Sequence, residues 1–351
     1  MTIYDNPRAG GDGPRLFRTS ADRPMAMLQQ CPAYEATPLC DMAPLAVALG
    51  VGSLRVKDET GRMNLGSFKA LGGAYAIAQM IADAAGSTDM AGARARLVAA
   101  GMTFITASAG NHGLSVAAGA RVFGARAVIV LCDAVPEGFA NRIRAMGAEV
   151  VRVAGTYEDS VAHAISAADS NGWLLLADGT WEGYVERPAL VMEGYTVLAE
   201  EIRAAFAASG DWPTHVFLQA GVGGLAAAVA GHIRDHWAKQ PIIIVVEPDA
   251  APCLMASVKA GQLTRAEGPM SNMGRLDCKD ASLIAFSALR RDADKFMTIT
   301  DGEAKAAEDT LSRQGIATTP SGAAPLAGLM AMKPGPDSRC LLIVSEGPEG
   351  D

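Results

Sequence analysis

The chain has 351 residues, a length that suits two domains better than a single small one. Half of its residues are hydrophobic, 19% are charged and the formal net charge is −8, which argues against nucleic-acid binding because that function needs a basic surface. No apolar run is long enough for a membrane-spanning helix, and residues 1–23 lack the apolar segment of a signal peptide. We therefore expect a cytoplasmic protein with no nucleic-acid or membrane partner, and a loosely held arm over residues 1–23.

The cysteines and histidines give no sign of a metal site or of a disulfide framework. Six cysteines and five histidines are scattered along the chain, without a Cys-x-x-Cys pair or the spacing of a zinc site. We expect reduced thiols and no bound metal.

The first predicted elements surround residue 69. Residues 54–57 alternate apolar and polar side chains, which predicts a strand. Ser67 is the expected N-cap of a helix that continues to about residue 84. Residues 85–100 are polar and rich in alanine, which predicts a helix or a surface excursion.

From residue 103 onwards, apolar strands alternate with helical segments. Strands are expected at 103–106, 127–131, 149–153, 173–176, 215–218, 242–246 and 340–344, and helices at 112–123, 136–146, 157–168, 190–208 and 225–237. This order predicts an α/β fold with mostly parallel, twisted sheets. We expect a larger domain from residues 1–72 and 190–351, and a smaller one from residues 73–189.

A glycine-rich loop, Gly221-Val222-Gly223-Gly224, lies between an apolar strand and an apolar helix. Glycines let backbone N–H groups converge, and a helix N-terminus adds positive potential, so the pattern is typical of a phosphate site. A dinucleotide-binding loop or a plain tight turn could have a similar sequence. The full Gly-x-Gly-x-x-Gly spacing is absent, which argues against the dinucleotide alternative.

Lys69 stands in the first turn of a predicted helix, beside Phe68 and Ala70. A helix N-terminus disfavours a cation, which favours a neutral, nucleophilic amine at this position. A solvated surface lysine is the alternative interpretation.

Other candidate residues follow predicted strands, where the sites of α/β folds form. Asn111 stands in a glycine-flanked turn that could press its amide against a flat ring, although a turn that caps a helix has the same pattern. We interpret His112 as a helix-start residue rather than a base. Asp178 and Ser345 each follow a strand, and each could also be a simple cap or strand end.

Taken in order, these segments resemble the diaminopropionate ammonia-lyase family of pyridoxal-phosphate enzymes, which have the tryptophan-synthase-β-like fold known as fold type II. The resemblance covers most of residues 36–347 and is carried by Phe68-Lys69-Ala70, Gly110-Asn111-His112-Gly113, Trp181-Glu182-Gly183-Tyr184 and Gln219-Ala220-Gly221-Val222-Gly223. The first two segments are shared with serine/threonine dehydratases. The last two are more specific to the ammonia-lyase branch.

The resemblance implies a role for each matched residue. Lys69 would hold pyridoxal phosphate as a Schiff base and remove the α-proton of the L-substrate, and Asp178 would bind and process the substrate's amino group. Asn111 would contact the ring hydroxyl, and Ser345 the pyridine nitrogen. The phosphate would be bound by Gly221, Val222, Gly223 and Gly224, and the substrate by Ser108, Ala109, Gly110 and His112.

Ala109 departs from the family pattern, which has an aspartate before Gly-Asn-His-Gly. The family uses that acid in handling the D-isomer. Its replacement argues against activity on a D-substrate and leaves open another leaving group, such as hydroxyl.

The activity implied by the resemblance is α,β-elimination of a small amino acid, most directly 2,3-diaminopropionate, to give pyruvate and ammonia. The main alternative is a dehydratase acting on L-serine, L-threonine or another β-hydroxy amino acid. β-Replacement with a thiol and a non-catalytic ligand-binding module are two others. A hydroxyl at Ser345 favours elimination, because a neutral pyridine ring is a weaker electron sink. The family also implies a homodimer.

Overall fold

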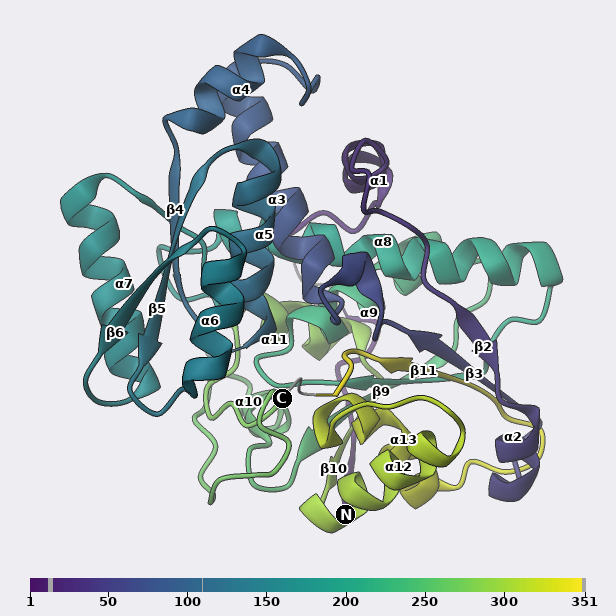
Figure 1. Ribbon diagram of the computed structural model, residues 1–351. Helices are drawn as coiled ribbons and strands as arrows, with labels where there is room; N and C mark the ends of the chain where they lie inside the picture. The colour runs from purple at the N-terminus through teal and green to yellow at the C-terminus, as the bar shows by residue number, and fades with distance from the viewer. Residues whose placement is uncertain (12–14, 109, 349–351) are drawn as a thin grey trace.

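The strands of the chain form two separate sheets (Figure 1). The computed structural model describes residues 1–11, 15–108 and 110–348. The larger sheet has seven strands in the order β1-β10-β9-β8-β11-β3-β2, and the smaller sheet has four in the order β6-β5-β4-β7. The bounds of the strands are β1 Thr2–Asp5, β2 Leu39–Asp41, β3 Ser53–Asp58, β4 Thr103–Ala107, β5 Arg126–Cys132, β6 Glu149–Val153, β7 Leu174–Leu175, β8 His215–Gln219, β9 Ile242–Pro248, β10 Lys295–Ile299 and β11 Arg339–Val344.

Parallel pairing dominates both sheets, which confirms the predicted α/β class. The five inner strands of the larger sheet are parallel, and only the edge strands β1 and β2 are antiparallel to their neighbours. All four strands of the smaller sheet are parallel. The inner strands are covered on both faces, which explains their continuous apolar runs.

Helices cover both faces of the larger sheet (Figure 1). Val216 and Leu218 of β8 face a core built with α8 and α9, whereas Phe217 faces a second core built with α12 and α13. The bounds of the helices are α1 Asp22–Leu28, α2 Ala43–Leu49, η1 Arg62–Asn64, α3 Lys69–Ala85, α4 Ala93–Ala100, α5 Asn111–Phe123, α6 Glu137–Ala145, α7 Tyr157–Asn171, α8 Glu186–Ser209, α9 Gly224–His236, α10 Cys253–Ala260, α11 Leu283–Asp292, α12 Asp301–Arg313 and α13 Pro320–Met332.

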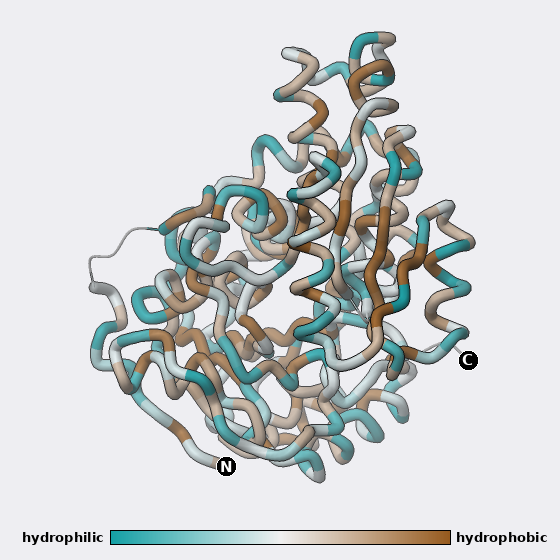
Figure 2. Tube along the Cα trace, turned by 90° about the vertical axis from the view of Figure 1, so that its left-hand side faces the viewer, coloured by the Kyte–Doolittle hydropathy of each residue, from teal (hydrophilic) through white to brown (hydrophobic). Residues whose placement is uncertain are grey.

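Hydrophobic stretches concentrate along the strands and the inward sides of the helices, and hydrophilic stretches occupy the outer loops (Figure 2). Within residues 1–11, 15–108 and 110–348, no helix has both the length and the apolar character that a bilayer crossing requires.

The prediction of a loosely held N-terminal arm is wrong. Residues 2–5 form the edge strand β1, which pairs with β10. Asn6 donates from Nδ2 to the carbonyl of Ala293 at 2.7 Å, and Arg15 forms an ion pair with the buried Asp292 at 2.8 Å. The ordered structure of this segment could not be predicted from its own sequence, because its partners lie almost 300 positions further along the chain.

The predicted N-cap of helix α3 is also wrong by one residue. The helix begins at Lys69 with Phe68 as N-cap, and no side chain caps it. The Ser67 hydroxyl instead accepts a hydrogen bond from the Lys69 backbone N–H at 3.3 Å. Strand β7 is shorter than predicted, because only Leu174 and Leu175 pair with β4.

Candidate active site

Lys69 is held at a junction between the two sheets. Its carbonyl accepts a hydrogen bond from Ser115 of helix α5 at 2.6 Å. The neighbouring Phe68 donates its backbone N–H to the carbonyl of Ser345 at 3.0 Å, and its ring packs edge-on against Tyr195 at 4.8 Å. Helix α5, helix α8 and the residue that follows strand β11 thus fix the backbone from which the Lys69 side chain projects.

The Lys69 ammonium is paired with the Asp178 carboxylate, and the two side chains are 24% and 23% exposed. Burial alone would raise the pKa of Asp178, but the charge of Lys69 and its hydrogen bond outweigh burial and hold that pKa well below its usual range. Asp178 is therefore an anion at neutral pH. The two residues predicted to be catalytic are brought into direct contact.

His112 is buried and neutral. Burial lowers its pKa, and its Nε2–H donates to the carbonyl of Leu176 at 2.7 Å. Its Nδ1 has no hydrogen-bond partner among the described residues. A fixed neutral imidazole with a bare Nδ1 can accept a proton or a hydrogen bond from a ligand.

The Ser108 hydroxyl holds the turn that leads into helix α5. It accepts backbone N–H groups from Gly113 at 2.9 Å and from Gly110 at 3.2 Å. This use of the hydroxyl explains why serine begins the Ser-Ala-Gly-Asn-His-Gly segment. Ala109, predicted to bind substrate, lies outside the described residues.

Two glycines of the loop, Gly221 and Gly223, are closely surrounded by neighbouring atoms. Gly223, the N-cap of α9, has φ of 100°, and a Cβ there would lie 2.8 Å from the Cβ of Ala285. A Cβ at Gly221 would lie 3.0 Å from the sulfur of Cys278. Glycine is required at position 223 by its positive φ and is favoured at position 221 by the close neighbours. The loop leads into the N-terminus of a 13-residue helix, which attracts an anion.

These groups match the chemical parts of pyridoxal phosphate. Lys69 offers an amine for the aldehyde, and the N-terminus of α9 with its glycine loop offers donors for the phosphate. Asn111 and Ser345 offer an amide and a hydroxyl, which suit a ring hydroxyl and a neutral pyridine nitrogen. The residues present therefore fit the cofactor.

Three site residues were missed by sequence reasoning: Arg275, Cys278 and Glu346. Glu346 is bonded to Asn111, and the Arg275 guanidinium lies against the backbone of Gly110. Burial and the Asp178 carboxylate raise the pKa of Cys278 to about 11. Arg275 and Cys278 lie in residues 262–300, whose sequence has no motif that would single them out.

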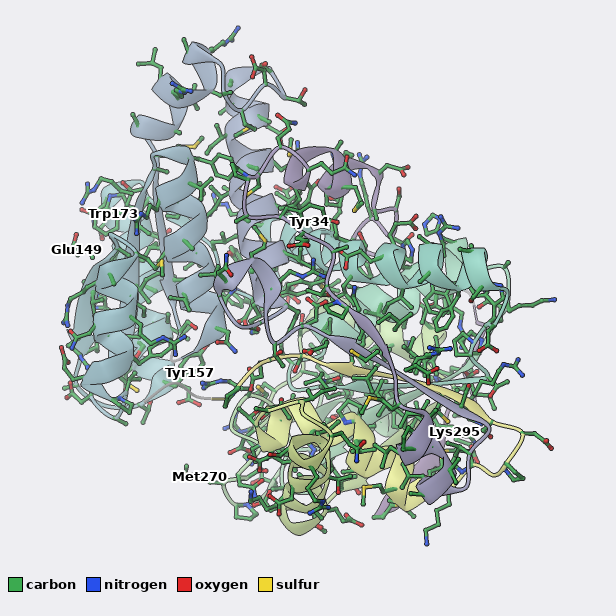
Figure 3. The ribbon with its side chains drawn as sticks, turned by 45° about the vertical axis from the view of Figure 1, so that its right-hand side comes forward. Tyr34, Glu149, Tyr157, Trp173, Met270 and Lys295 are labelled. Atoms are coloured by element: carbon green, nitrogen blue, oxygen red, sulfur yellow. The ribbon has the colours of Figure 1, made fainter. Side chains whose placement is uncertain are left out.

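A groove runs from the glycine loop to the segment that begins at Gly179. It is lined by Gly179, Thr180, Trp181, Glu182, Val222, Leu263, Thr264, Arg265, Asp280, Ala281 and Ser282. In Figure 3, Tyr157 lies at the end of the smaller unit that faces the larger sheet. Residues 263–265 and 280–282 thus form one wall of this groove, next to Val222 of the glycine loop.

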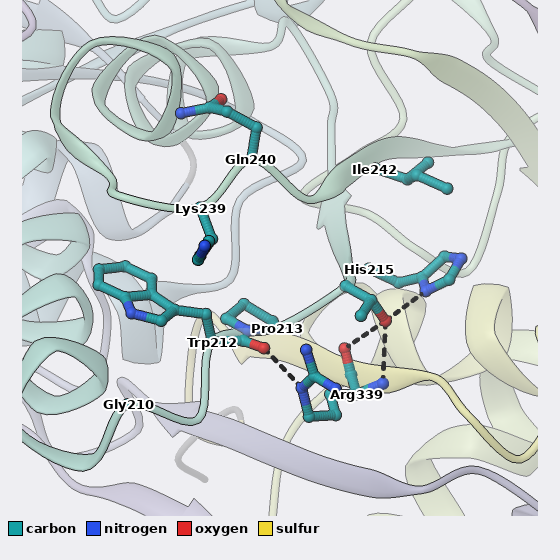
Figure 4. A pocket seen from close by; sticks show the side chains of 9 residues that line it. Gly210, Trp212, Pro213, His215, Lys239, Gln240, Ile242 and Arg339 are labelled. Atoms are coloured by element: carbon teal, nitrogen blue, oxygen red, sulfur yellow. Dashed lines mark hydrogen bonds between the residues drawn. The ribbon is translucent and has the colours of Figure 1, made fainter.

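A separate pocket lies at the opposite end of the strands of the larger sheet (Figure 4). It is lined by Gly210, Trp212, Pro213, Thr214, His215, Lys239, Gln240, Ile242 and Arg339. These residues lie at the amino-terminal ends of β8, β9 and β11, whereas the glycine loop and Ser345 follow the carboxyl ends. The pocket is thus remote from Lys69.

Glu247, at the end of β9, has a structural role. It is fully buried, and its two oxygens accept the backbone N–H groups of Leu254 and Met255 at 2.7 and 2.9 Å. Burial raises the pKa of Glu247 to about 8, although the two donors oppose this shift.

The raised pKa of Glu247 predicts a pH-dependent stability. Above its unfolded pKa of about 4.3, the folded state retains a proton that the unfolded state has lost, so stability falls as pH rises towards 8. We expect Glu247→Gln to remove up to about 1.4 kcal/mol per pH unit of this slope. Urea unfolding of the native protein and of Glu247→Gln at pH 6.5 and 8 measures this change in the free energy of unfolding. The same pH dependence in the two proteins would contradict a protonated Glu247 in the folded state.

Comparisons with known proteins agree with this geometry. Residues 31–346 match the family model described as "Pyridoxal-phosphate dependent enzyme". Diaminopropionate ammonia-lyase of Escherichia coli (strain K12) is 35% identical over 310 residues, covering 87% of this chain and 78% of that protein. A probable D-serine dehydratase of Acidovorax ebreus (strain TPSY) is 28% identical over 313 residues, covering 82% and 68%.

The fold agrees equally well with a solved relative. The crystal structure of the Escherichia coli diaminopropionate ammonia-lyase in complex with D-serine superposes with a TM-score of 0.88 at 32% identity, covering 99% of this chain and 93% of that chain. The predicted fold type is thereby confirmed. The chain belongs to the pyridoxal-phosphate-dependent enzymes, in the branch of lyases that contains the diaminopropionate ammonia-lyases.

Proposed function

We propose that this lyase converts 2,3-diaminopropionate into pyruvate and ammonia by α,β-elimination. The observation that carries the proposal is the contact between Lys69 and Asp178, which pairs the expected base with a fixed anion. The similarity to the Escherichia coli ammonia-lyase supports the same substrate class.

Pyridoxal phosphate, when bound, supplies the electron-accepting ring that acidifies the α-proton. Lys69 has two tasks in this proposal: its amine holds the cofactor, and the same amine takes the α-proton once the substrate has displaced it. The glycine loop and the N-terminus of α9 hold the phosphate. Asn111 and Ser345 orient the ring, and His112 accepts a hydrogen bond at Nδ1.

Asp178 discriminates between substrates by charge. The Lys69 ammonium lowers the pKa of Asp178 against the effect of burial, so the carboxylate stays an anion while a cation is its partner. When Lys69 is engaged with the cofactor, its positive charge is no longer available to Asp178. The β-ammonium of a diamino acid can replace that charge, whereas the hydroxyl of serine cannot.

Asp178→Asn should therefore separate the two substrate classes. We expect kcat/KM for L-2,3-diaminopropionate to fall by about 10²–10³-fold, since an amide does not compensate the β-ammonium. The rate with L-serine should change by less than about tenfold. Steady-state kinetics with both substrates provide the comparison, and equal losses would argue against recognition of the ammonium by Asp178.

The direct test is an assay of pyruvate and ammonia with cofactor-loaded protein and four substrates: L- and D-2,3-diaminopropionate, L-serine and L-threonine. Two ammonia molecules for each pyruvate from the L-diamino acid, without activity on the D-isomer, are the expected result. Ala109 is the reason to expect no D-activity. Turnover of hydroxy amino acids alone, with one ammonia each, would make the protein a dehydratase, the alternative that Ala109 favours.

We further propose a cytoplasmic homodimer whose chain divides into the domains 1–72 with 190–351 and 73–189. The smaller sheet lies wholly within residues 73–189, which supports these boundaries. Ser108, Ala109, Gly110 and His112 are proposed to contact the substrate, because they precede or begin α5 beside Asn111.

A further inference from the structure

Glu346 is a buried carboxylate beside the residues proposed to bind the cofactor. It follows Ser345 at the end of β11 and is only 4% exposed. Three segments far apart in sequence meet at its side chain: helix α5, helix α13 and the loop that carries Arg275.

Two hydrogen-bond donors and one cation within the described residues face this carboxylate. Asn111 donates from Nδ2 to Oε2 at 2.5 Å, and Thr319 donates its hydroxyl to Oε1 at 2.7 Å. Nε of Arg275 lies 3.8 Å from Oε2. A carboxylate only accepts, so it can bond both Asn111 and Thr319, whereas the amide of a glutamine would direct an N–H at one of them.

The surrounding charges also favour an anion at this position. Asn111 is the first residue of α5, and Thr319 is the N-cap of α13, so two helix N-termini point towards the carboxylate. Arg275 adds a positive charge from a third direction. Glu346 is thus an acceptor that the fold keeps in place without the cofactor.

Such an acceptor decides which way the Asn111 amide faces. An asparagine amide can be turned by half a rotation with almost no change of shape, so packing alone does not distinguish its oxygen from its nitrogen. With the oxygen towards Glu346, two acceptors would meet. With the nitrogen there, one N–H is bonded and the second remains available as a donor.

We propose that Glu346 is a positioning residue, which presents the Asn111 amide as a donor to the ring hydroxyl of the cofactor before the cofactor arrives. This inference rests on the proposed contact of Asn111 with that hydroxyl. Glu346 acts here only through Asn111, and no proton or bond of the substrate passes through it.

The test is a double-mutant cycle of Glu346→Gln and Asn111→Ala, read as the dissociation constant of pyridoxal phosphate and as the pH dependence of the visible absorbance of the loaded protein. We expect each single variant to bind the cofactor about tenfold more weakly, and the double variant to be no weaker than the weaker single within about twofold. If the double variant bound the cofactor more weakly by the product of the two single effects, the two residues would act independently and the proposal would be overturned. An unchanged dissociation constant in Glu346→Gln would also overturn it.

Thr319→Val is the matched control, because it removes a donor to Glu346 without touching Asn111. We expect it to lower the thermal midpoint of the cofactor-free protein while changing cofactor affinity by less than about threefold. If it weakened cofactor binding as much as Glu346→Gln does, Glu346 would be a general structural residue.

A second arm remains informative if the alanine variant folds poorly. Asn111→Asp sets two carboxylates together, and adding Glu346→Gln restores a hydrogen bond of reversed polarity. We expect the thermal midpoint to recover and cofactor affinity to stay low, because an aspartate has no N–H to offer the ring. Recovery of both would overturn the proposal. None of these readouts uses an amino-acid substrate, so an error in the proposed reaction would leave them unaffected and would appear only in the product assay.

Discussion

Replacement of Lys69 by alanine should reduce turnover by about four orders of magnitude, the largest effect expected for any single substitution in this chain. The variant loses both the amine that holds the cofactor and the base that takes the α-proton. The structure gives Lys69 a fixed backbone and pairs its ammonium with Asp178. Among the described residues, no other lysine is paired with Asp178. We therefore expect no substitute amine.

The loss can be followed without substrate. Reduction with borohydride should attach the cofactor to the Lys69 peptide of the native protein, and mass spectrometry should find no such adduct in Lys69→Ala. Lys305→Ala is the control, because Lys305 is an exposed lysine of α12 that pairs with Glu308 and Asp309 of the same helix. Full activity in Lys69→Ala, or an adduct at another lysine, would remove Lys69 from its proposed role.

Arg62→Met should destabilise the protein by about 3–5 kcal/mol, the largest stability effect that we expect. The Arg62 guanidinium is fully buried and is bonded to the carboxylates of Glu59 and Glu201 at 2.7 Å. Lys57 and Tyr34, the latter labelled in Figure 3, complete the cluster through Glu201. Without Arg62, Glu201 keeps its bond to the Lys57 ammonium, but the buried Glu59 loses the guanidinium that it pairs with.

Urea unfolding of the cofactor-free protein measures this effect, and Arg144→Met is the control. Arg144 also pairs with a glutamate, Glu137, but its side chain is 44% exposed, so we expect a loss of about 1 kcal/mol or less. The pKa of Glu201 is lowered, because its bonds to Arg62 and Lys57 outweigh its burial. Its contribution is therefore complete above about pH 4.5 and is lost as pH falls further. A cost for Arg62→Met as small as that of the control would show that the cluster adds no stability.

The cluster also bears on catalysis, because Arg62 begins the turn that precedes Lys69. Met63 and Asn64 in this turn have φ of 50° and 57°, a conformation that non-glycine residues rarely adopt. Bonds from Arg62 to Glu59 hold the turn at its start. We expect Arg62→Met to lower cofactor affinity as well as stability.

Sequence patterns predicted the parts of the fold in which local preference and burial agree. Strand 149–153 was predicted with its observed bounds, and the inner strands 242–246 and 340–344 were recognised from continuous apolar runs. Strand β10 and helices α10 to α13 were not predicted. The helix that starts at Asp301 has a detectable signal, a capping box between Thr300 and Glu303.

The site was predictable to the extent that its residues belong to short motifs. Lys69, Asn111 and the glycine loop were identified in this way, and Asp178 was recognised because it follows a strand. Glu346 and Arg275 were not, because their value depends on contacts made across more than one hundred positions. Such contacts leave no periodic or local trace in one sequence.

The position of β11 has a consequence for synthesis on the ribosome. This strand lies between β3 and β8, which end at Asp58 and Gln219, yet it begins only at Arg339. Until that segment has left the ribosome, β3 and β8 lack their common neighbour, and the nascent chain carries open apolar strand edges that can pair with other chains. The lysine that should hold the cofactor is made early. Ser345, whose carbonyl accepts the backbone N–H of the neighbouring Phe68, and Glu346, which is bonded to Asn111, are made late. Assembly of the complete candidate site must therefore wait for the synthesis of residues 339–346, and ribosomes that stall before this segment will favour aggregation over an active enzyme.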